Sequence, residues 1–208
     1  MRLTVSDLAI SRGDLALAHH LTFAVEGGGA LVVTGANGSG KSTLLRAIAG
    51  LHPPDTGAVA LAIGGEAVAM AQNSHLLGHA NAMKADLTVR ENLAFWAGAL
   101  GGGGGTAGLL GEAADALSLA GLLDLPFGYL SAGQRRRVAL ARLWVAPRPL
   151  WLLDEPTAAL DARSEGAVRE MIEAHRAEGG MVVAATHVDL GLADAGTLSM
   201  DAPTMDPA

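Results

Sequence analysis

The chain has 208 residues, of which 50% are hydrophobic but only 3% aromatic, so its core must be built from Ala, Val, Leu and Ile. This length suits one compact domain, or one domain with a subdomain inserted in it. The formal net charge is −7, which disfavours general DNA or RNA binding because nucleic-acid binders normally carry a basic face. The absence of cysteine excludes disulfides, a thiol nucleophile and a Cys-ligated metal site.

The longest uncharged window, residues 92–111, has the length of a membrane span. It contains the run Gly101–Gly105, and glycine is a poor helix former. We therefore predict a helix end, a glycine loop and a helix start instead of a span. No basic region followed by an apolar stretch opens the chain, so we expect no targeting segment.

Short apolar runs separated by turns predict four strands in the first third of the chain, at residues 3–6, 21–25, 30–34 and 58–63. From Lys41 the apolar period becomes helical, and Gly50 is expected to end that helix.

The middle of the chain is predicted to be helical. Thr88–Glu91 and Ser131–Gln134 have the form of capping boxes, so helices are expected to begin at these points. The second of these helices is expected to reach about Val145, where Pro147 follows. Another helix is expected around Leu109–Leu119, after the glycine run.

The last third predicts two strands buried on both faces, at 150–153 and 181–185, with an amphipathic helix at 163–177 between them. Strands that alternate with helices indicate a parallel α/β core, into which the helical middle is inserted. The tail, 202–208, has two prolines and is expected to be loose.

The segment Gly35–Ser42 fits the pattern G-x-x-x-x-G-K-[ST] between a predicted strand and a predicted helix, the context that a phosphate-binding loop requires. Its glycines let backbone N–H groups turn toward phosphate oxygens, and the helix N-terminus adds a positive dipole end. Lys41 is one of only two lysines in the chain and is placed to reach the β- and γ-phosphates. We expect ATP contacts from Gly35, Asn37, Gly38, Ser39, Gly40, Lys41, Ser42 and Thr43.

A second pair of candidates follows the buried strand at 150–153. Asp154 is expected to join Ser42 in holding Mg²⁺, and Glu155 to polarise the attacking water. Two adjacent acids are common in solvated turns, and it is the phosphate loop upstream that favours the functional interpretation.

The segment Leu130–Gln134 resembles the signature motif of ABC-type ATPases. Ala159–Asp161 is similar to the D-loop of that family, and Thr186–His187 to its H-loop, so the resemblance spans essentially the whole chain to His187. It implies an α/β fold, a P-loop NTPase core with a mainly parallel sheet flanked by helices. An N-terminal antiparallel β subdomain and an inserted helical subdomain are implied with it.

The resemblance implies a single ABC ATPase domain over residues 1–208. Within it we expect a nucleotide-binding core with the β subdomain at 1–84 and 149–200. A helical signature subdomain is expected at 85–148, and a loose tail at 201–208.

The family's mechanism implies that two copies of the chain sandwich two ATP molecules head to tail. The signature residues then contact the γ-phosphate held by the opposite copy; they are Ser131, Ala132, Gly133 and Gln134. His187 is expected to sense the γ-phosphate and to act with Glu155 in catalysis, and Asp161 to make a contact across the dimer.

Two positions depart from the family pattern. The segment Ile10–Gly13 lacks the aromatic residue that usually stacks on adenine, and Arg12 could stack its guanidinium plane instead. For the Q-loop glutamine the candidates are Gln72 and the position of Ala80. We favour Ala80, within a Q-loop region of His79, Ala80 and Asn81, so that the usual contact to Mg²⁺ and water is either missing or replaced by His79 or Asn81.

The segments around His79, Trp96 and Tyr129 look most like those of the cytochrome c maturation (haem exporter) ATPases. That resemblance implies ATP hydrolysis with Mg²⁺, integral membrane subunits as partners and a peripheral position on the cytoplasmic side of the inner membrane. We expect no nucleic-acid partner and no direct haem binding, and Arg135–Arg137 is interpreted as a solvated or ion-paired face.

Three alternatives stay open. Another small ABC exporter would use the same motor. A soluble ABC-type ATPase acting on DNA or ribosomes usually carries a second cassette, a coiled-coil insertion or basic arms, and none is present in the sequence. A P-loop kinase would leave the segment Ser131–Gln134 without a role.

Overall fold

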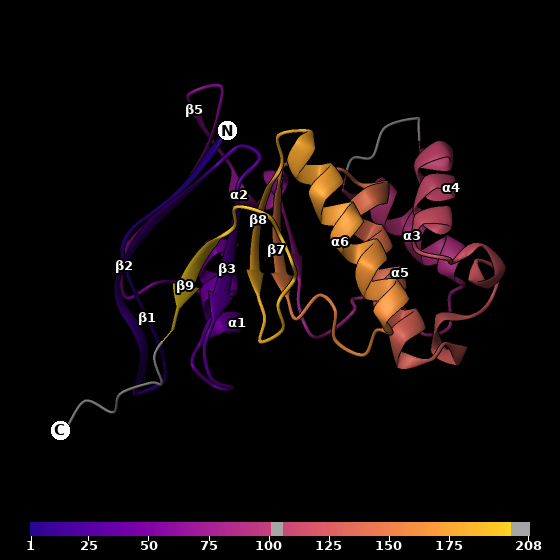
Figure 1. The fold of residues 1–208 in the computed structure, drawn as a ribbon, viewed down its shortest axis with the longest axis horizontal. Coiled ribbons are helices and arrows are strands. Elements are labelled where there is room, and N and C mark those ends of the chain that lie inside the picture. The colour runs from indigo at the N-terminus through magenta and orange to yellow at the C-terminus, as the bar shows by residue number, and fades with distance from the viewer. Residues whose placement is uncertain (101–105, 201–208) are drawn as a thin grey trace. The chain divides into compact units, whose positions relative to one another are not determined.

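The computed structural model of the protein describes residues 1–100 and 106–200 (Figure 1), so the predicted glycine loop and loose tail lie outside the described residues. The chain forms two compact units. The first unit comprises Met1–Gly78, Pro149–Glu155 and Glu173–Ala208, and the second comprises His79–Arg148 and Pro156–Ile172. The second unit thus includes residues 156–172, which the predicted subdomain limits assign to the core.

The N-terminal sheet of the first unit is antiparallel, with strand order β2-β1-β4-β5. Its strands are β1 (Arg2–Arg12), β2 (Leu15–Glu26), β4 (Thr56–Ile63) and β5 (Glu66–Val68). In β1 the apolar side chains Leu3, Val5, Leu8 and Ile10 are buried. This spacing keeps them on one face despite a register shift between Val5 and Leu8. The predicted antiparallel β subdomain is confirmed, with longer strands than the apolar runs suggested.

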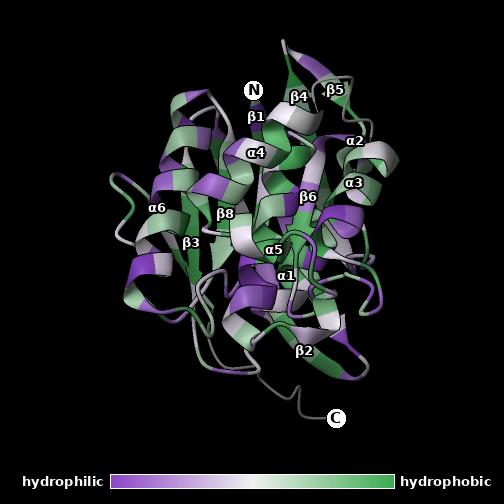
Figure 2. Ribbon diagram, turned by 90° about the vertical axis from the view of Figure 1, so that its right-hand side faces the viewer, coloured by the Kyte–Doolittle hydropathy of each residue, from purple (hydrophilic) through white to green (hydrophobic). Residues whose placement is uncertain are grey.

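The second sheet of this unit is parallel, with strand order β6-β7-β8-β3-β9. Its strands are β6 (Ser74–Leu77), β7 (Leu150–Asp154), β8 (Met181–Ala185), β3 (Ala30–Thr34) and β9 (Gly196–Ser199). Every residue of β7 and β8 is buried, as predicted for strands covered on both faces. Figure 2 shows the hydrophobic colour along β3 and β8.

Helix α1 (Lys41–Ile48) packs against β7 and β8 and contributes to the same core. Its predicted inner residues, Leu44, Leu45 and Ile48, are at most 1% exposed. Gly50, in a left-handed conformation with φ 74°, follows the helix and donates its N–H to the carbonyl of Ala47. The predicted helix end is therefore confirmed. A short helix, α2 (Met70–Asn73), precedes β6.

The second unit is helical. Its helices are α3 (Val89–Ala99), α4 (Thr106–Ala116) and α5 (Ala132–Val145), with 3-10 turns at Ala120–Leu122 and Phe127–Tyr129. Both predicted capping boxes are confirmed, at Thr88 with Glu91 and at Ser131 with Gln134. Helix α6 (Ala162–Ala177) begins in this unit and ends in the first. Within residues 1–100 and 106–200, no helix is both long and apolar enough to cross a membrane.

A face-to-face pair of rings lies in the first unit. Trp151 and His175 stack with centroids 3.8 Å apart and planes 4° apart. A Cβ at Gly180 would overlap the His175 ring, so the ring fits because residue 180 has no side chain. Burial lowers the pKa of His175 from 6.5 to about 4, although hydrogen bonds to the backbone of Met181 and Pro149 raise it.

We predict that this histidine makes the protein less stable in acid. Above pH 6.5 the ring is neutral in the folded and unfolded chain, so it adds no pH dependence there. Between pH 6.5 and about 4 the unfolded chain binds a proton that the folded chain does not. The free energy of unfolding then falls by at most about 1.4 kcal/mol per pH unit from this group.

Urea unfolding between pH 7 and about pH 4 checks this prediction. The matched variant is His175→Phe, which keeps an aromatic ring on Trp151 and cannot titrate. Its free energy of unfolding should depend less steeply on pH than that of the wild type. Equal slopes for the two proteins would contradict the assigned role of His175.

Candidate functional site

The predicted phosphate-binding loop lies between β3 and α1. Gly35, Gly38 and Gly40 all have φ between 85° and 139°, in the left-handed region that glycine adopts at no steric cost. At Gly35 a Cβ would overlap the carbonyl oxygen of Met200, and at Gly40 it would lie 2.8 Å from the Cβ of Leu17. The loop therefore needs glycine for its backbone conformation and for the close approach of neighbouring segments.

The lysine of this loop is 7% exposed and bonds back onto the loop. Its Nζ donates to the carbonyl oxygens of Gly35, at 2.7 Å, and Ala36, at 3.0 Å. Ser39 is fully buried, and its hydroxyl has no hydrogen-bond partner in the described structure. A buried lysine and a buried, unsatisfied hydroxyl are both costly unless a polar ligand reaches them, which is what a phosphate would supply.

Strands β7 and β8 end at the same sheet edge as β3, because the three strands are parallel and in register. The 5% exposed side chain of Asp154 ends β7, and Glu155 follows it with φ 47°. The N–H of Glu155 donates to the carbonyl of Ala185 at 2.8 Å. That hydrogen bond fixes Glu155 to the last residue of β8, which directly precedes Thr186.

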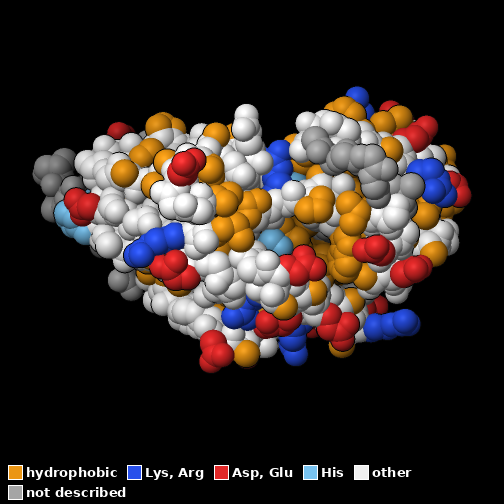
Figure 3. All heavy atoms as spheres, turned by 90° about the horizontal axis from the view of Figure 1, so that it is seen from above, with side chains coloured by type: hydrophobic (Ala, Val, Ile, Leu, Met, Phe, Trp, Pro, Cys, Tyr) orange, Lys and Arg blue, Asp and Glu red, His pale blue; other side chains and the backbone are white. Residues whose placement is uncertain are grey.

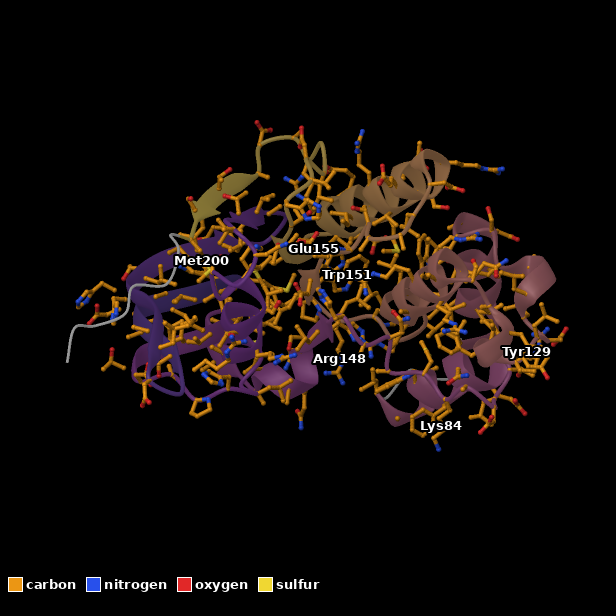
Figure 4. The ribbon with its side chains drawn as sticks, turned by 90° about the horizontal axis from the view of Figure 1, so that it is seen from below. Lys84, Tyr129, Arg148, Trp151, Glu155 and Met200 are labelled. Carbon is orange, nitrogen blue, oxygen red and sulfur yellow. The ribbon has the colours of Figure 1, made fainter. Side chains whose placement is uncertain are left out.

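Glu155 and His187 form a pair across the ends of β7 and β8. His187 Nδ1 lies 3.0 Å from Glu155 Oε1, and the Thr186 hydroxyl donates to Glu155 Oε2 at 3.3 Å. The Glu155 side chain is 14% exposed and that of His187 is 67% exposed. Figure 4 labels Glu155 at the end of β7, the strand that also carries Trp151. The arrangement holds the Glu155 carboxylate in place and leaves most of the His187 side chain exposed.

The residues of the predicted Mg²⁺ site fit that ion chemically. Ser42 lies in the first turn of α1, which packs on β7, and Asp154 ends β7. A hydroxyl and a carboxylate are hard oxygen ligands of the kind that Mg²⁺ takes together with substrate phosphates. Among the described residues there is no cluster of three or more His, Asp or Glu that could hold a metal alone.

The signature segment belongs to the second unit. Ser131 Oγ accepts the N–H of Gln134 at 3.3 Å, and the Gln134 side chain accepts the N–H of Ser131 at 2.8 Å. Ser131 and Ala132 are exposed at the start of α5. A Cβ at Gly133 would lie 2.8 Å from the carbonyl oxygen of Ala159. The helix start is thus capped and exposed, and its glycine lies against the predicted D-loop.

Asp161 has a structural role that is separate from the predicted contact across the dimer. Its Oδ1 accepts the N–H of Ser164 at 2.8 Å, as an N-cap of α6 does. This backbone bond, with smaller contributions from the Ser164 side chain, Arg137 and Arg163, lowers the pKa of Asp161. The carboxylate is exposed and stays charged, so it can also meet a partner.

The Q-loop candidates lie on opposite sides of β6. Gln72 belongs to α2, before the strand, whereas His79, Ala80 and Asn81 come after its carboxyl end in chain order. The other candidate residues lie at or after the carboxyl ends of parallel strands. Ala80 also follows a parallel strand, whereas Gln72 precedes it, so chain order agrees with the choice of Ala80. The assignment stays a prediction.

Sequence reasoning missed three neighbours of these residues. Leu17 and Met200 lie against the predicted phosphate-binding loop, and the Thr186 hydroxyl donates a hydrogen bond to Glu155 Oε2. Leu17 and Met200 are apolar residues whose only sequence signal is burial. Thr186 was part of the H-loop resemblance but had no assigned role.

A glycine loop after β3, two acids at the end of β7 and a histidine after β8 form the arrangement that the sequence predicted for an ATP-binding α/β protein. The family model of the ABC transporter matches residues 18–158, and the chain belongs to this family of ATP-binding proteins. ATPase activity follows from that membership, and the predicted fold class is confirmed.

The relatives are more specific. The chain is 52% identical to the "Cytochrome c biogenesis ATP-binding export protein CcmA" of Rhizobium meliloti (strain 1021), over 96% of this chain and 98% of that protein. It is 52% identical to the protein of the same name in Brucella abortus (strain 2308), over 92% and 88%. The resemblance to cytochrome c maturation ATPases is thereby confirmed.

Solved structures share the fold. An ABC transporter ATP-binding protein of Pyrococcus furiosus superposes with a TM-score of 0.82 at 24% identity, covering 96% of this chain and 98% of that one. An ATP-binding subunit of an ABC transporter gives 0.82 at 26% identity, covering 90% and 80%.

We predict that Gly40→Ala weakens ATP binding more than Gly38→Ala. Both glycines have left-handed φ, so each alanine costs roughly 1–2 kcal/mol of backbone strain. Only at Gly40 does the new Cβ meet Leu17, whereas nothing lies within 4 Å at Gly38. We expect at least about a tenfold larger loss of affinity for Gly40→Ala, measured with a fluorescent ATP analogue.

The contact itself is tested by a double variant. Leu17→Ala in the Gly40→Ala background should recover part of the affinity, because it removes the atoms that the Cβ meets. Equal affinities for Gly38→Ala and Gly40→Ala, with no recovery, would show that Leu17 does not constrain the loop.

Proposed function

We propose that this chain is the ATP-hydrolysing subunit of a membrane complex for cytochrome c biogenesis. The observation that carries the proposal is 52% identity, over 96% of the chain, to a relative named as a cytochrome c biogenesis ATP-binding export protein. The sheet edge that gathers the phosphate-binding loop, Asp154, Glu155 and His187 supports the hydrolytic part of the proposal.

ATP would bind with its phosphates over the start of α1. The N–H groups of the loop and the helix dipole attract the phosphate oxygens. Lys41 exchanges its bonds to the carbonyls of Gly35 and Ala36 for the β- and γ-phosphates, so its charge moves a short way on binding. The proposed phosphate contacts are Gly35, Asn37, Gly38, Ser39, Gly40, Lys41, Ser42 and Thr43.

Ser42 and Asp154 would hold Mg²⁺ beside these phosphates. The ion, when bound, neutralises charge that develops on the phosphate oxygens during transfer. Asp154 is 5% exposed and ends a fully buried strand, so its carboxylate has little freedom to move. Ser42 is fixed by its position in the first turn of α1.

Glu155 would accept a proton from the attacking water, and His187 would hold that carboxylate and contact the γ-phosphate. The bonds from Thr186 and His187 orient the carboxylate before ATP arrives. His187 then donates from Nδ1, which leaves Nε2 as the ring atom available to the nucleotide. Such an arrangement stabilises the transition state by positioning rather than by a covalent intermediate.

A second copy of the chain would complete each ATP site. The capped start of α5 presents N–H groups that suit an anion, and Ser131, Ala132, Gly133 and Gln134 would contact the γ-phosphate of the opposite copy. Asp161 would make a contact across the dimer. ABC ATP-binding subunits work as such dimers together with membrane partners.

The chain would dock on integral membrane subunits at the cytoplasmic face of the inner membrane. The second unit exposes the large apolar side chains Phe95, Leu125 and Tyr129, the last 84% exposed. Figure 4 labels Tyr129 and Lys84 in this unit. In Figure 3 basic and acidic side chains are interspersed over the face in view, with hydrophobic ones among them. Exposed apolar side chains of this kind suit a protein partner better than the phosphate backbone of a nucleic acid.

Glu155→Gln tests the hydrolytic step. Glutamine keeps the size and a hydrogen-bond acceptor but cannot take a proton, so we expect kcat to fall by about a hundredfold or more with ATP affinity retained. The matched control is Glu170→Gln on the exposed face of α6, which removes the same charge elsewhere. Phosphate release and fluorescent-ATP binding are the measurements.

A Rhizobium meliloti strain that lacks its 52%-identical relative tests the biological part. The wild-type chain and Glu170→Gln should restore covalently bound haem in c-type cytochromes, seen by haem staining, and Glu155→Gln should not. Failure of an expressed, ATP-hydrolysing wild-type chain would contradict the cytochrome c role while leaving the ATPase intact. Normal turnover by Glu155→Gln would contradict the catalytic assignment.

A further inference from the structure

Three consecutive arginines of α5 each bond the backbone of a different segment. Arg135 donates to the carbonyl of Gly128 at 2.6 Å, Arg136 to Pro156 at 3.2 Å, and Arg137 to Leu117 at 2.7 Å and Ser118 at 2.9 Å. Arg136 is only 5% exposed, so it does not lie on a solvated face, which was one of the two expectations for Arg135–Arg137. The hydrogen bonds to backbone carbonyls show that Arg135–Arg137 connect α5 to neighbouring segments.

The partner of Arg136 begins the loop 156–161, which ends at Asp161. This loop meets α5 at a second place, where the Cα of Gly133 lies against the carbonyl of Ala159. Ala159 has φ 63°, a left-handed conformation that costs a non-glycine residue energy and persists only where surrounding contacts hold it. The loop therefore depends on α5 for its shape.

Asp161, at the end of the loop, is held by a different helix. Its carboxylate caps α6 through the N–H of Ser164, so the end of the loop is tied to one helix and its beginning to another. A guanidinium bond to a carbonyl is charge-assisted and directional, and burial removes the water that would compete for it. Arg136 is thus the side chain that ties the loop's first carbonyl to α5.

We propose that Arg136 is a positioning residue that holds the loop 156–161 on α5, so that Asp161 and the start of α5 move as one body. The inference rests on the proposed function, which gives Asp161 and the signature residues their contacts with a second copy. If Asp161 and the start of α5 move together, a single docking step would bring both into contact with the second copy. Loss of Arg136 would then impair turnover without touching the bound phosphates.

The chain has no cysteine, so two introduced cysteines can carry spin labels without further changes. Ala158 in the loop and Ala94 on α3 are both exposed and belong to the second unit. Distances between labels at Ala158→Cys and Ala94→Cys, measured by pulsed electron paramagnetic resonance on the full chain, report the loop's position. We expect one narrow distribution in the otherwise wild-type protein.

Arg136→Met should broaden that distribution, because it keeps an apolar stem but loses the donor. Arg136→Gln carries the same test if the methionine variant does not fold, and Arg136→Lys, which keeps a charged donor, should retain the narrow distribution. Arg137→Met is the matched control, since Arg137 hydrogen bonds the carbonyls of Leu117 and Ser118 and has only a small charge effect on Asp161. Without labels, Arg136→Met should lower kcat about tenfold with KM for ATP nearly unchanged.

An unchanged distribution in both neutral variants, or equal broadening in Arg137→Met, would overturn the proposal. A fall in kcat without broadening would also overturn it, because the loop would then not be what moved. The label distances need no ATP, so they stand even if Glu155→Gln shows that the proposed catalytic role is wrong.

Discussion

The register of the parallel strands β3, β7 and β8 is the constraint on which the nucleotide site depends. Because these strands run in the same direction and pair in register, the segments that follow them meet at one edge. One segment carries Lys41 and the glycines proposed to bind phosphate, the next carries Asp154 and Glu155, and the third carries Thr186 and His187. A slip of the β7–β8 register would separate Glu155 from the carbonyl of Ala185 and from His187.

At that edge, glycines allow close packing of neighbouring segments, and burial places polar side chains inside the loop. Gly35 and Gly40 allow Met200 and Leu17 to pack against the loop, so the loop is held from outside as well as by its own bonds. Lys41 and the Ser39 hydroxyl are buried with the loop, which places polar groups where phosphate would meet them. In the second unit α5 has a comparable organising role, because its capped start, Gly133 and Arg136 meet the segment that ends at Asp161.

Local signals predicted much of this arrangement. The strands at 150–154 and 181–185, the capping boxes at Thr88 and Ser131, and the context of the phosphate loop follow from short-range periodicity and side-chain chemistry. Contacts between distant residues could not be predicted, because nothing local encodes them. The Glu155–His187 pair, the Trp151–His175 stack and the bond of Arg136 to Pro156 all join segments that only the tertiary fold brings together.

The central claim is that ATP binds at the strand edge and is enclosed by a second copy of the chain. Light scattering of Glu155→Gln with ATP and Mg²⁺ measures this most directly, because slow hydrolysis preserves the enclosed state. The account predicts a molar mass of twice 21.0 kDa with ATP, and of 21.0 kDa with ADP or without nucleotide. A mass that stays at 21.0 kDa when ATP is bound at saturation would contradict it.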